Sequence, residues 1–461
     1  MNRYKIFILA VFLSLVMVLF SFTFLRAEEI NEREVLFSLS FPSDPSDSAD
    51  SEKNERLSLT LQEAIEIALA KNKGILITKE KIKEAQQSVR IARSRYFPSL
   101  DLNANYTYLS EVPSFEVPGG GTVEMGQKDN YNIALSLAQP LYASGRINLG
   151  YKQTKLNYQK AKEDLSCKES EIIFEVKKTF YSSLLARENL NLVKESLEQA
   201  QRHLNVVESF YQTGRVSKFD LLTTKVEVSN IKPGVIQAEN ALRLSVEGLA
   251  NLLSLPPASL KLKGEFKFEP IKIDLEEAIE KALSYRSDLK SLELQEKMGE
   301  ISFQLAHLAN KPSLSLVSNY QHSNPFKGKK EWGEDWNINL ILSMHLLDVG
   351  KSQAIVSQRK SQLNQINLSL EQLKDGIILQ VKSAFWDIKA VRQSILAQKE
   401  NIGQAKEALL IAENRYKNGT ITNLEALDAQ LALTRAKVGY LKALYDYNIA
   451  QATLEKTINI K

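Results

Sequence analysis

The sequence predicts a mainly α-helical protein that also carries transmembrane β-strands. Three observations predict this class. The chain contains two copies of one unit, each copy has two segments in which apolar and polar residues alternate, and each pair of segments is followed by a long proline-free helical pattern. An N-terminal apolar run adds an export signal.

The N-terminal region is typical of a signal peptide over residues 1–27. Arg3 and Lys5 precede an apolar run from Ile6 to Leu25, and acidic and polar residues follow Ala27. The sequence predicts cleavage after Ala27. Because the residues before Ala27 match the small-x-small rule poorly, an uncleaved membrane anchor is the alternative. The stretch "FPSDPSDSADSEKNER" from Phe41 is rich in Ser, Asp and Pro, and residues 28–58 are predicted to be a flexible leader.

The repeat is visible as matched blocks. "LQEAIEIAL" from Leu61 recurs as "LEEAIEKAL" from Leu275, 214 residues later, while Gly214 pairs with Gly419 at a spacing of 205. The first copy therefore covers residues 59–254, a linker covers 255–274, and the second copy covers 275–461. Two copies are too few for a solenoid, so the chain is a duplicated unit.

Each copy contains a predicted strand pair. The alternation predicts strands at 98–109 and 129–141 in the first copy and at 312–322 and 335–347 in the second. Strands of about ten residues with one apolar face fit a tilted transmembrane strand. A half-buried sheet of a soluble protein is the alternative, and the export signal favours the membrane.

Long helices follow each strand pair. Apolar residues at steps of three and four predict coiled-coil helices over about 146–212 and 351–417, each a rod of roughly 100 Å. Shorter helices are predicted before the strand pairs (61–96 and 275–308) and after the glycines (217–253 and 422–458). Pro233-Gly234 predicts a kink or local unwinding in the first copy only.

Four strands cannot close a barrel, and open edges in a bilayer would leave backbone groups without partners. Three chains would supply twelve strands and a lumen, whereas two would supply eight and a filled bore. We therefore expect a homotrimer with a twelve-stranded barrel, continued by an α-helical coiled-coil tunnel whose far tip carries the turns at Gly214 and Gly419.

The composition points to no other class of function. A net charge of +4 over more than a hundred charged residues gives no basic stripe for nucleic acid. The four histidines and single Cys167 are not at metal-ligand spacing, and no nucleophile or phosphate-loop motif is present. We expect no catalytic residues, no metal and no cofactor.

Several motifs together carry a family resemblance. They are "FPSLDL" entering the first strand, "QPLYASGR" between strand and helix, and the pattern G-T-x-T-x-x-[DE]-x-L-D-A from Gly419 to Ala429. Over Leu59 to Ile458 the chain resembles the TolC family of outer-membrane efflux proteins. The resemblance implies a homotrimeric barrel among outer-membrane lipids and a helical tunnel in the periplasm. It also implies docking on a periplasmic adaptor (membrane fusion) protein coupled to an inner-membrane pump of the RND, ABC or MFS type.

The acidic residues at the second tip have two interpretations. Glu425 and Asp428 lie three apart on one helix face, where the helix dipole favours carboxylates. Three chains around an axis would also make them a ring of six carboxylates that concentrates cations. In the resembled family, residues matching these two line the periplasmic constriction.

The resemblance further implies a closed-state latch made by Asp220 and Tyr416. The family's arginine partner falls on Ile421, so Arg215 or Lys218 is a candidate substitute. The adaptor-docking tips would comprise Gly214, Arg215, Ser217, Gly419, Thr420 and Thr422. The same residues also fit a plain helix stop and N-cap.

The sequence therefore predicts a passive exit duct of a tripartite efflux or type I secretion system in the cell outer membrane. The alternative is a non-conducting coiled-coil spacer or scaffold of the envelope, with an exported enzyme a distant third.

Overall fold

A computed structural model describes residues 57–459, apart from 117, 125, 257–259 and 271–273. The predicted signal peptide, its cleavage site and the leader up to residue 56 lie outside the described residues. The chain divides into two compact units. Lys83–Gln159 and Gln295–Ile366 form a sheet unit, and the other described residues form a helical unit, so each unit draws on both repeats.

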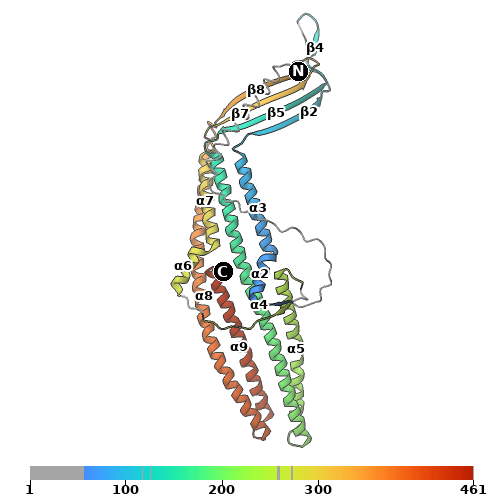
Figure 1. Cartoon of the computed structure of the whole chain (residues 1–461), viewed down its shortest axis with the longest axis vertical. Helices are drawn as coiled ribbons and strands as arrows, with labels where there is room; N and C mark the ends of the chain where they lie inside the picture. The colour runs from blue at the N-terminus through green and yellow to red at the C-terminus, as the bar shows by residue number, and fades with distance from the viewer. Residues whose placement is uncertain (1–56, 117, 125, 257–259, 271–273, 460–461) are drawn as a thin grey trace. The chain divides into compact units, whose positions relative to one another are not determined.

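The sheet unit contains a four-stranded antiparallel sheet in the order β2-β5-β7-β8. The strands span Ser99–Tyr108, Asp129–Tyr142, Ser313–Asn324 and Gly333–Ser343. The connection from β2 to β5 contains a short hairpin of β3 (Ser114–Glu116) and β4 (Thr122–Glu124), which extends beyond the end of the sheet (Figure 1). The prediction that the last strand reaches residue 347 was wrong. Ser343 pairs with Ser313, and the next residue of the partner is Pro312, which has no N–H to continue the ladder.

The two faces of this sheet differ in chemistry. Large apolar side chains on one face are exposed, including Leu102 (69 %), Leu340 (64 %) and Leu342 (70 %). On the other face a row of uncharged side chains is hydrogen-bonded in two groups, which together include residues of all four strands. Asn105 of β2 bonds to Asn132 of β5, and Ser136 of β5 bonds to Asn319 of β7, which bonds to Asn337 of β8 and through it to Asn339. The predicted alternation is confirmed as a real division between the faces.

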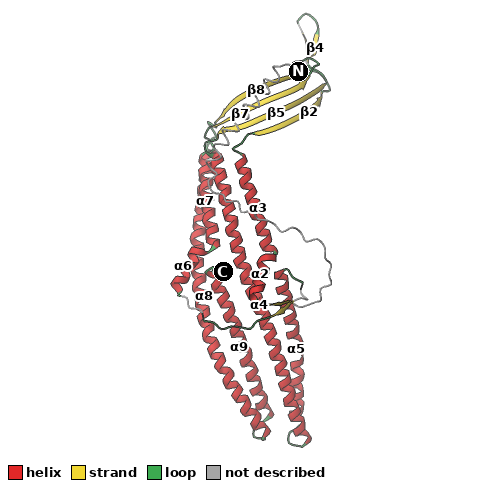
Figure 2. Cartoon of the chain, in the orientation of Figure 1, coloured by secondary structure: helices red, strands yellow, loops and turns green. Residues whose placement is uncertain are grey.

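The helical unit is built on two helical hairpins (Figure 2). The first joins α4 (Arg146–Gln212) to α5 (Lys218–Leu253), and the second joins α8 (Lys351–Lys417) to α9 (Asn423–Thr457). Both long helices have the predicted bounds. Their seams are apolar, with Ala200, Leu204 and Val228 buried in one and Ala405, Leu409 and Leu433 in the other. Helix α5 is helical throughout, Pro233 included, so of the two alternatives expected there local unwinding does not occur, and the kink stays a prediction.

The shorter helices were predicted as continuous, and that prediction was wrong. The structure has α2 (Leu61–Lys71) and α3 (Lys73–Ser94) in one repeat, and α6 (Leu275–Tyr285) and α7 (Ser287–His307) in the other. The breaks fall at Asn72 and Arg286, equivalent positions of the repeat with extended backbone. The Asn72 carboxamide accepts from Gly74 N–H and donates to the Leu252 carbonyl, so a side chain replaces the lost helical bonds.

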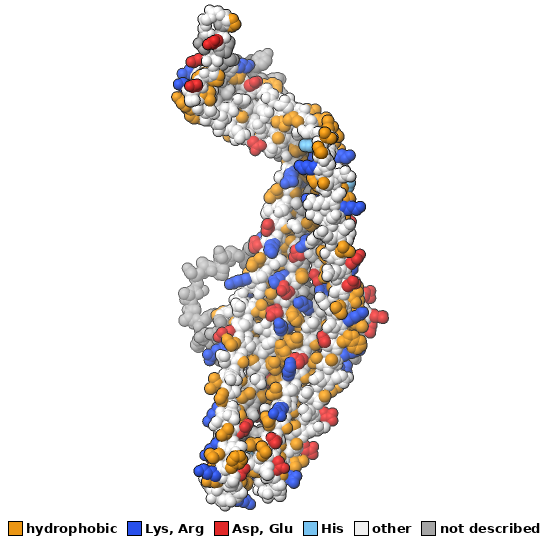
Figure 3. All heavy atoms as spheres, turned by 180° about the vertical axis from the view of Figure 1, so that it is seen from behind, with side chains coloured by type: hydrophobic (Ala, Val, Ile, Leu, Met, Phe, Trp, Pro, Cys, Tyr) orange, Lys and Arg blue, Asp and Glu red, His pale blue; other side chains and the backbone are white. Residues whose placement is uncertain are grey.

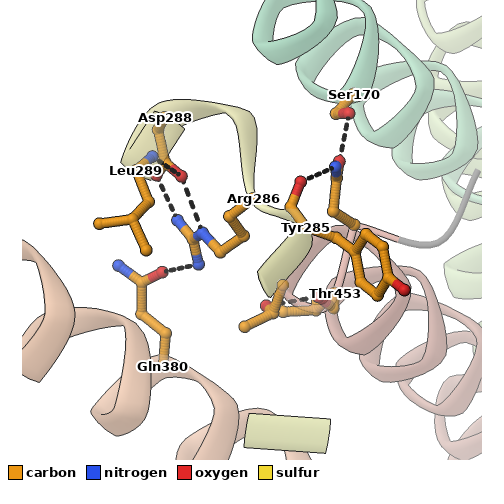
Figure 4. A network of polar contacts seen from close by, with 9 residues as sticks. Ser170, Tyr285, Arg286, Asp288, Leu289, Gln380 and Thr453 are labelled. Carbon is orange, nitrogen blue, oxygen red and sulfur yellow. Dashed lines mark hydrogen bonds and ion pairs between the residues drawn. The ribbon is translucent and has the colours of Figure 1, made fainter. Parts of the chain in front are cut away.

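At the second break, between α6 and α7, the charged side chain of Arg286 stabilises the interrupted backbone (Figure 4). Its guanidinium donates to both carboxylate oxygens of Asp288, at 3.0 and 2.6 Å, and to Gln380 of α8 at 2.8 Å. Burial alone would raise the pKa of Asp288, but the bonds and charge of Arg286 outweigh it and hold that pKa below its usual range. Nearby, Asn459 donates to the Tyr285 carbonyl and accepts from Ser170, which fixes the end of the second repeat.

The linker between the repeats contains a strand that was not predicted. Leu260–Leu262 (β6) pairs in parallel with Leu57–Leu59 (β1), so the predicted leader ends in a strand. Leu59, Leu260 and Leu262 are buried with Val176 and Phe180 of α4 in the largest apolar cluster of the helical unit. Three-residue strands are too short to show a period in the sequence.

Within the described residues, no helix is sufficiently long and apolar to cross a membrane. The face drawn in Figure 3 carries basic, acidic and apolar side chains interspersed. That mixture agrees with the small net charge of the sequence.

Candidate functional site

The two hairpins end in turns of the same local geometry. Gly214 and Gly419 have φ of 72° and 71°. In each turn the glycine N–H bonds to a carbonyl three residues back, and the next residue's N–H bonds to one five back: Arg215 to Phe210 at 2.8 Å and Thr420 to Arg415 at 2.9 Å. This is the Schellman helix end, in which glycine avoids the steric cost of a left-handed backbone.

The helices that follow both begin with a capping box. Ser217 and Asp220 make one, and Thr422 and Glu425 make the other. In each, the hydroxyl accepts from the N–H of the acidic residue, whose carboxylate accepts from the hydroxyl residue's N–H. The acidic residues at both tips therefore have a structural role in starting a helix.

The two turns lie side by side, in agreement with the expectation that both belong to the far tip (Figure 1). Val207, Tyr416 and Ala426 are buried in a shared apolar cluster, against which Val216 and Ile421 pack from the two turns. The position where the resembled family has an arginine is thus filled by an aliphatic side chain in van der Waals contact. Arg215, one of the candidate substitutes, lies 5.1 Å above the ring of Phe210 in its own turn.

Tyr416 and Asp220, the predicted latch, lie in the same region. Tyr416 is 5 % exposed, and among the described residues its hydroxyl has no hydrogen-bond partner. Burial, followed by the charge of Asp220, raises the pKa of Tyr416. The Asp220 carboxylate accepts from the backbone and hydroxyl of Ser217 at 3.1 and 2.6 Å. The latch stays a prediction. In this structure the Asp220 carboxylate is bound within the capping box of its own helix.

Glu425 and Asp428 are both exposed in the first turns of α9. The backbone N–H of Thr422 donates to Glu425 at 2.7 Å and the hydroxyl at 2.9 Å, and these two bonds, in that order, lower the pKa of Glu425. Glu425 is therefore negatively charged at neutral pH. The predicted docking residues Gly214, Arg215, Ser217, Gly419, Thr420 and Thr422 are also all exposed.

A polar seam between α4 and α9 was missed by the sequence reasoning. It pairs Lys177 with Glu455, Ser182 with Tyr445, Glu195 with Lys437, and, nearest the turns, His203 with Asn423. The signal was weak, because polar residues on long helices are usually solvated. Only their meeting across two hairpins distinguishes them.

The capping boxes allow a first prediction that separates structure from charge. Thr422→Ala removes the cap and should cost about 1 kcal/mol of helix stability. Exchange of the Glu425 amide hydrogen should then be about fivefold faster. Glu425→Gln should leave that exchange nearly unchanged, because glutamine also completes a capping box. Unchanged exchange in Thr422→Ala would show that the cap does not hold this turn, and Ser217→Ala provides the matched test in the first repeat.

Comparisons with known proteins place this geometry in a family. The sequence matches the family described as "Outer membrane efflux protein" over residues 64–254 and 278–459. It is 23 % identical over 382 residues to the outer membrane protein TolC of Vibrio cholerae, covering 81 % of this chain and 84 % of that protein. It is 24 % identical over 398 residues to TolC of Escherichia coli K12, covering 81 % and 77 %.

Among solved structures, the Campylobacter jejuni CmeC outer membrane channel matches with a TM-score of 0.77. The match covers 91 % of this chain and 93 % of that one at 18 % identity. The predicted fold class, four strands per chain combined with long helices and an internal repeat, is confirmed.

Proposed function

The chain belongs to the outer membrane efflux protein family, located in the outer membrane, and we propose that it is the passive exit duct of a tripartite efflux or type I secretion system. The observation that carries the proposal is the hydrogen-bonded row of uncharged side chains across the sheet. A closed barrel built from this sheet would have that row on its inner face and the exposed leucines toward lipid.

The edges of the sheet support assembly. Among the described strands, β2 and β8 are the two ends of the four-stranded order, so each has an edge whose backbone donors and acceptors point away from the sheet. Those groups need partners in a bilayer. A homotrimer in which β8 of one chain pairs with β2 of the next would satisfy them with twelve strands.

The tips support docking. Both turns present glycine and small hydroxyl residues to solvent, which lets another backbone approach closely. We infer that a helical hairpin of a periplasmic adaptor binds there, with an inner-membrane pump supplying the energy. Glu425 and Asp428 would then line the entrance from the adaptor.

The duct can be tested by thiol labelling in planar bilayers. Cys167→Ser removes the chain's single cysteine, after which Asn337→Cys and Ile338→Cys place one thiol on each face of β8. A charged, membrane-impermeant thiol reagent should lower the single-channel conductance of the Asn337→Cys trimer. It should leave that of Ile338→Cys unchanged, because that side chain lies on the apolar face.

A non-conducting spacer would show no channels before any reagent is added, and that result would overturn the duct. Block in Ile338→Cys alone would reverse the assignment of the two faces. The parent Cys167→Ser channel, treated with the same reagent, is the control.

A further inference from the structure

A series of hydrogen bonds, buried at its centre, crosses from one hairpin to the other next to the tip turns. His203 of α4 lies 2.7 Å from Asn423 Oδ1 at the start of α9. The Asn423 side-chain nitrogen lies 3.0 Å from the Thr224 hydroxyl of α5, and that hydroxyl lies 2.8 Å from the Asp220 carbonyl. Asn423 and Thr224 are 5 % and 1 % exposed, so the bond between these two residues is shielded from water, whereas His203 is partly exposed.

The direction of every bond in this series is fixed by its last member. The Asp220 carbonyl can only accept, so the Thr224 hydroxyl donates to it and accepts from the Asn423 amide. The Asn423 oxygen therefore faces His203, and His203 must donate from Nε2. One asparagine thus joins three helices with its donor and its acceptor both satisfied.

Among the described residues, this series of hydrogen bonds is the polar connection between the two hairpins that lies nearest the turns. Ile421 contributes packing only, and the Asp220 carboxylate is held by Ser217 of its own helix. The Glu195–Lys437 ion pair lies farther along the helices and is partly exposed, where solvent weakens it. A buried amide loses more on separation, because each of its groups would be left without a partner.

We propose that Asn423, positioned by His203 and Thr224, holds the two hairpins of one protomer together in the closed tip through its hydrogen bonds. It performs in this chain the joining role for which Ile421 has no chemistry. The proposal rests on the proposed duct function, because these hydrogen bonds affect conduction only if the tips separate to open a passage. Asn423 is a positioning residue and is not assigned any contact with the exported substrate.

The test compares the gating of variants in planar bilayers. Asn423→Leu removes both bonds and should raise the ratio of time at high to time at low conductance about tenfold. Asn418→Leu is the matched control, because Asn418 is exposed in the same tip, and it should leave that ratio unchanged. His203→Ala should also raise the ratio. In the double variant His203→Ala/Asn423→Leu the ratio should rise by less than the product of the two single increases, because both substitutions remove the same hydrogen bond.

Equal ratios for Asn423→Leu and wild type, in trimers that conduct normally, would overturn the proposed role of Asn423 without affecting the proposed duct function. Absence of any conductance in wild type would instead overturn the duct. If Asn423→Leu fails to assemble, Thr224→Val decides, since it deletes the hydroxyl at nearly constant volume. It should raise the ratio as well, and an unchanged ratio would reject the proposal.

Discussion

Phe180→Ala is expected to lower the free energy of unfolding by about 3–5 kcal/mol, the usual cost of removing a buried phenylalanine. Phe180 is 2 % exposed in the middle of α4. It packs with both short strands of the helical unit, and Gly264 lies beside its ring, where an added Cβ would be in ordinary van der Waals contact at 3.8 Å. The cavity would therefore separate α4 from the segment that joins the repeats.

Chemical denaturation of the detergent-solubilised protein, followed by far-UV circular dichroism, would measure this loss. Phe219→Ala is the matched control, since Phe219 is 76 % exposed. Its expected change is within about 0.5 kcal/mol. Equal losses in the two variants would show that the cluster around Phe180 does not hold the helical unit together.

Neutralising the acidic pair of the second tip is expected to abolish most of the cation selectivity. In the double variant Glu425→Gln/Asp428→Asn, a trimer would lose six negative charges from its entrance. The ratio of cation to anion permeability should fall about tenfold at low salt and less at high salt, because ions screen exposed charges. Glutamine keeps the capping box, so the turn itself should persist.

Reversal potentials across a potassium chloride gradient would give this ratio. Glu407→Gln, an exposed carboxylate of α8 away from the turn, is the control and should leave selectivity unchanged. An unaltered reversal potential in the double variant would restrict Glu425 and Asp428 to helix capping and dipole stabilisation.

Much of the fold was predictable because it rests on local periodicity. The bounds of α4 and α8 came directly from the coiled-coil pattern, and three of the four main strands agree within two residues, because side-chain alternation is a local property. The failures share a cause. Asn72 and Arg286 break helices through contacts with Leu252 and Gln380, which are remote in sequence.

The candidate site divides in the same way. Gly214, Gly419 and both capping boxes are readable from the residues, since a helix end and a helix start depend on neighbours a few positions away. The sequence placed both turns at the far tip, but it could not show that Ile421 packs beside Tyr416 or that His203 and Asn423 are hydrogen-bonded partners 220 residues apart.

By itself, then, the sequence determined the repeat, the element types, the two-faced strands and the chemistry of each turn. Tertiary structure alone decided that β5 pairs with β7 to join the repeats into one sheet, and that α4 lies against α9 along a polar seam. The physical reason is range. Periodicity and capping act over one or two turns of backbone, whereas pairing between repeats depends on which surfaces the folded chain brings together.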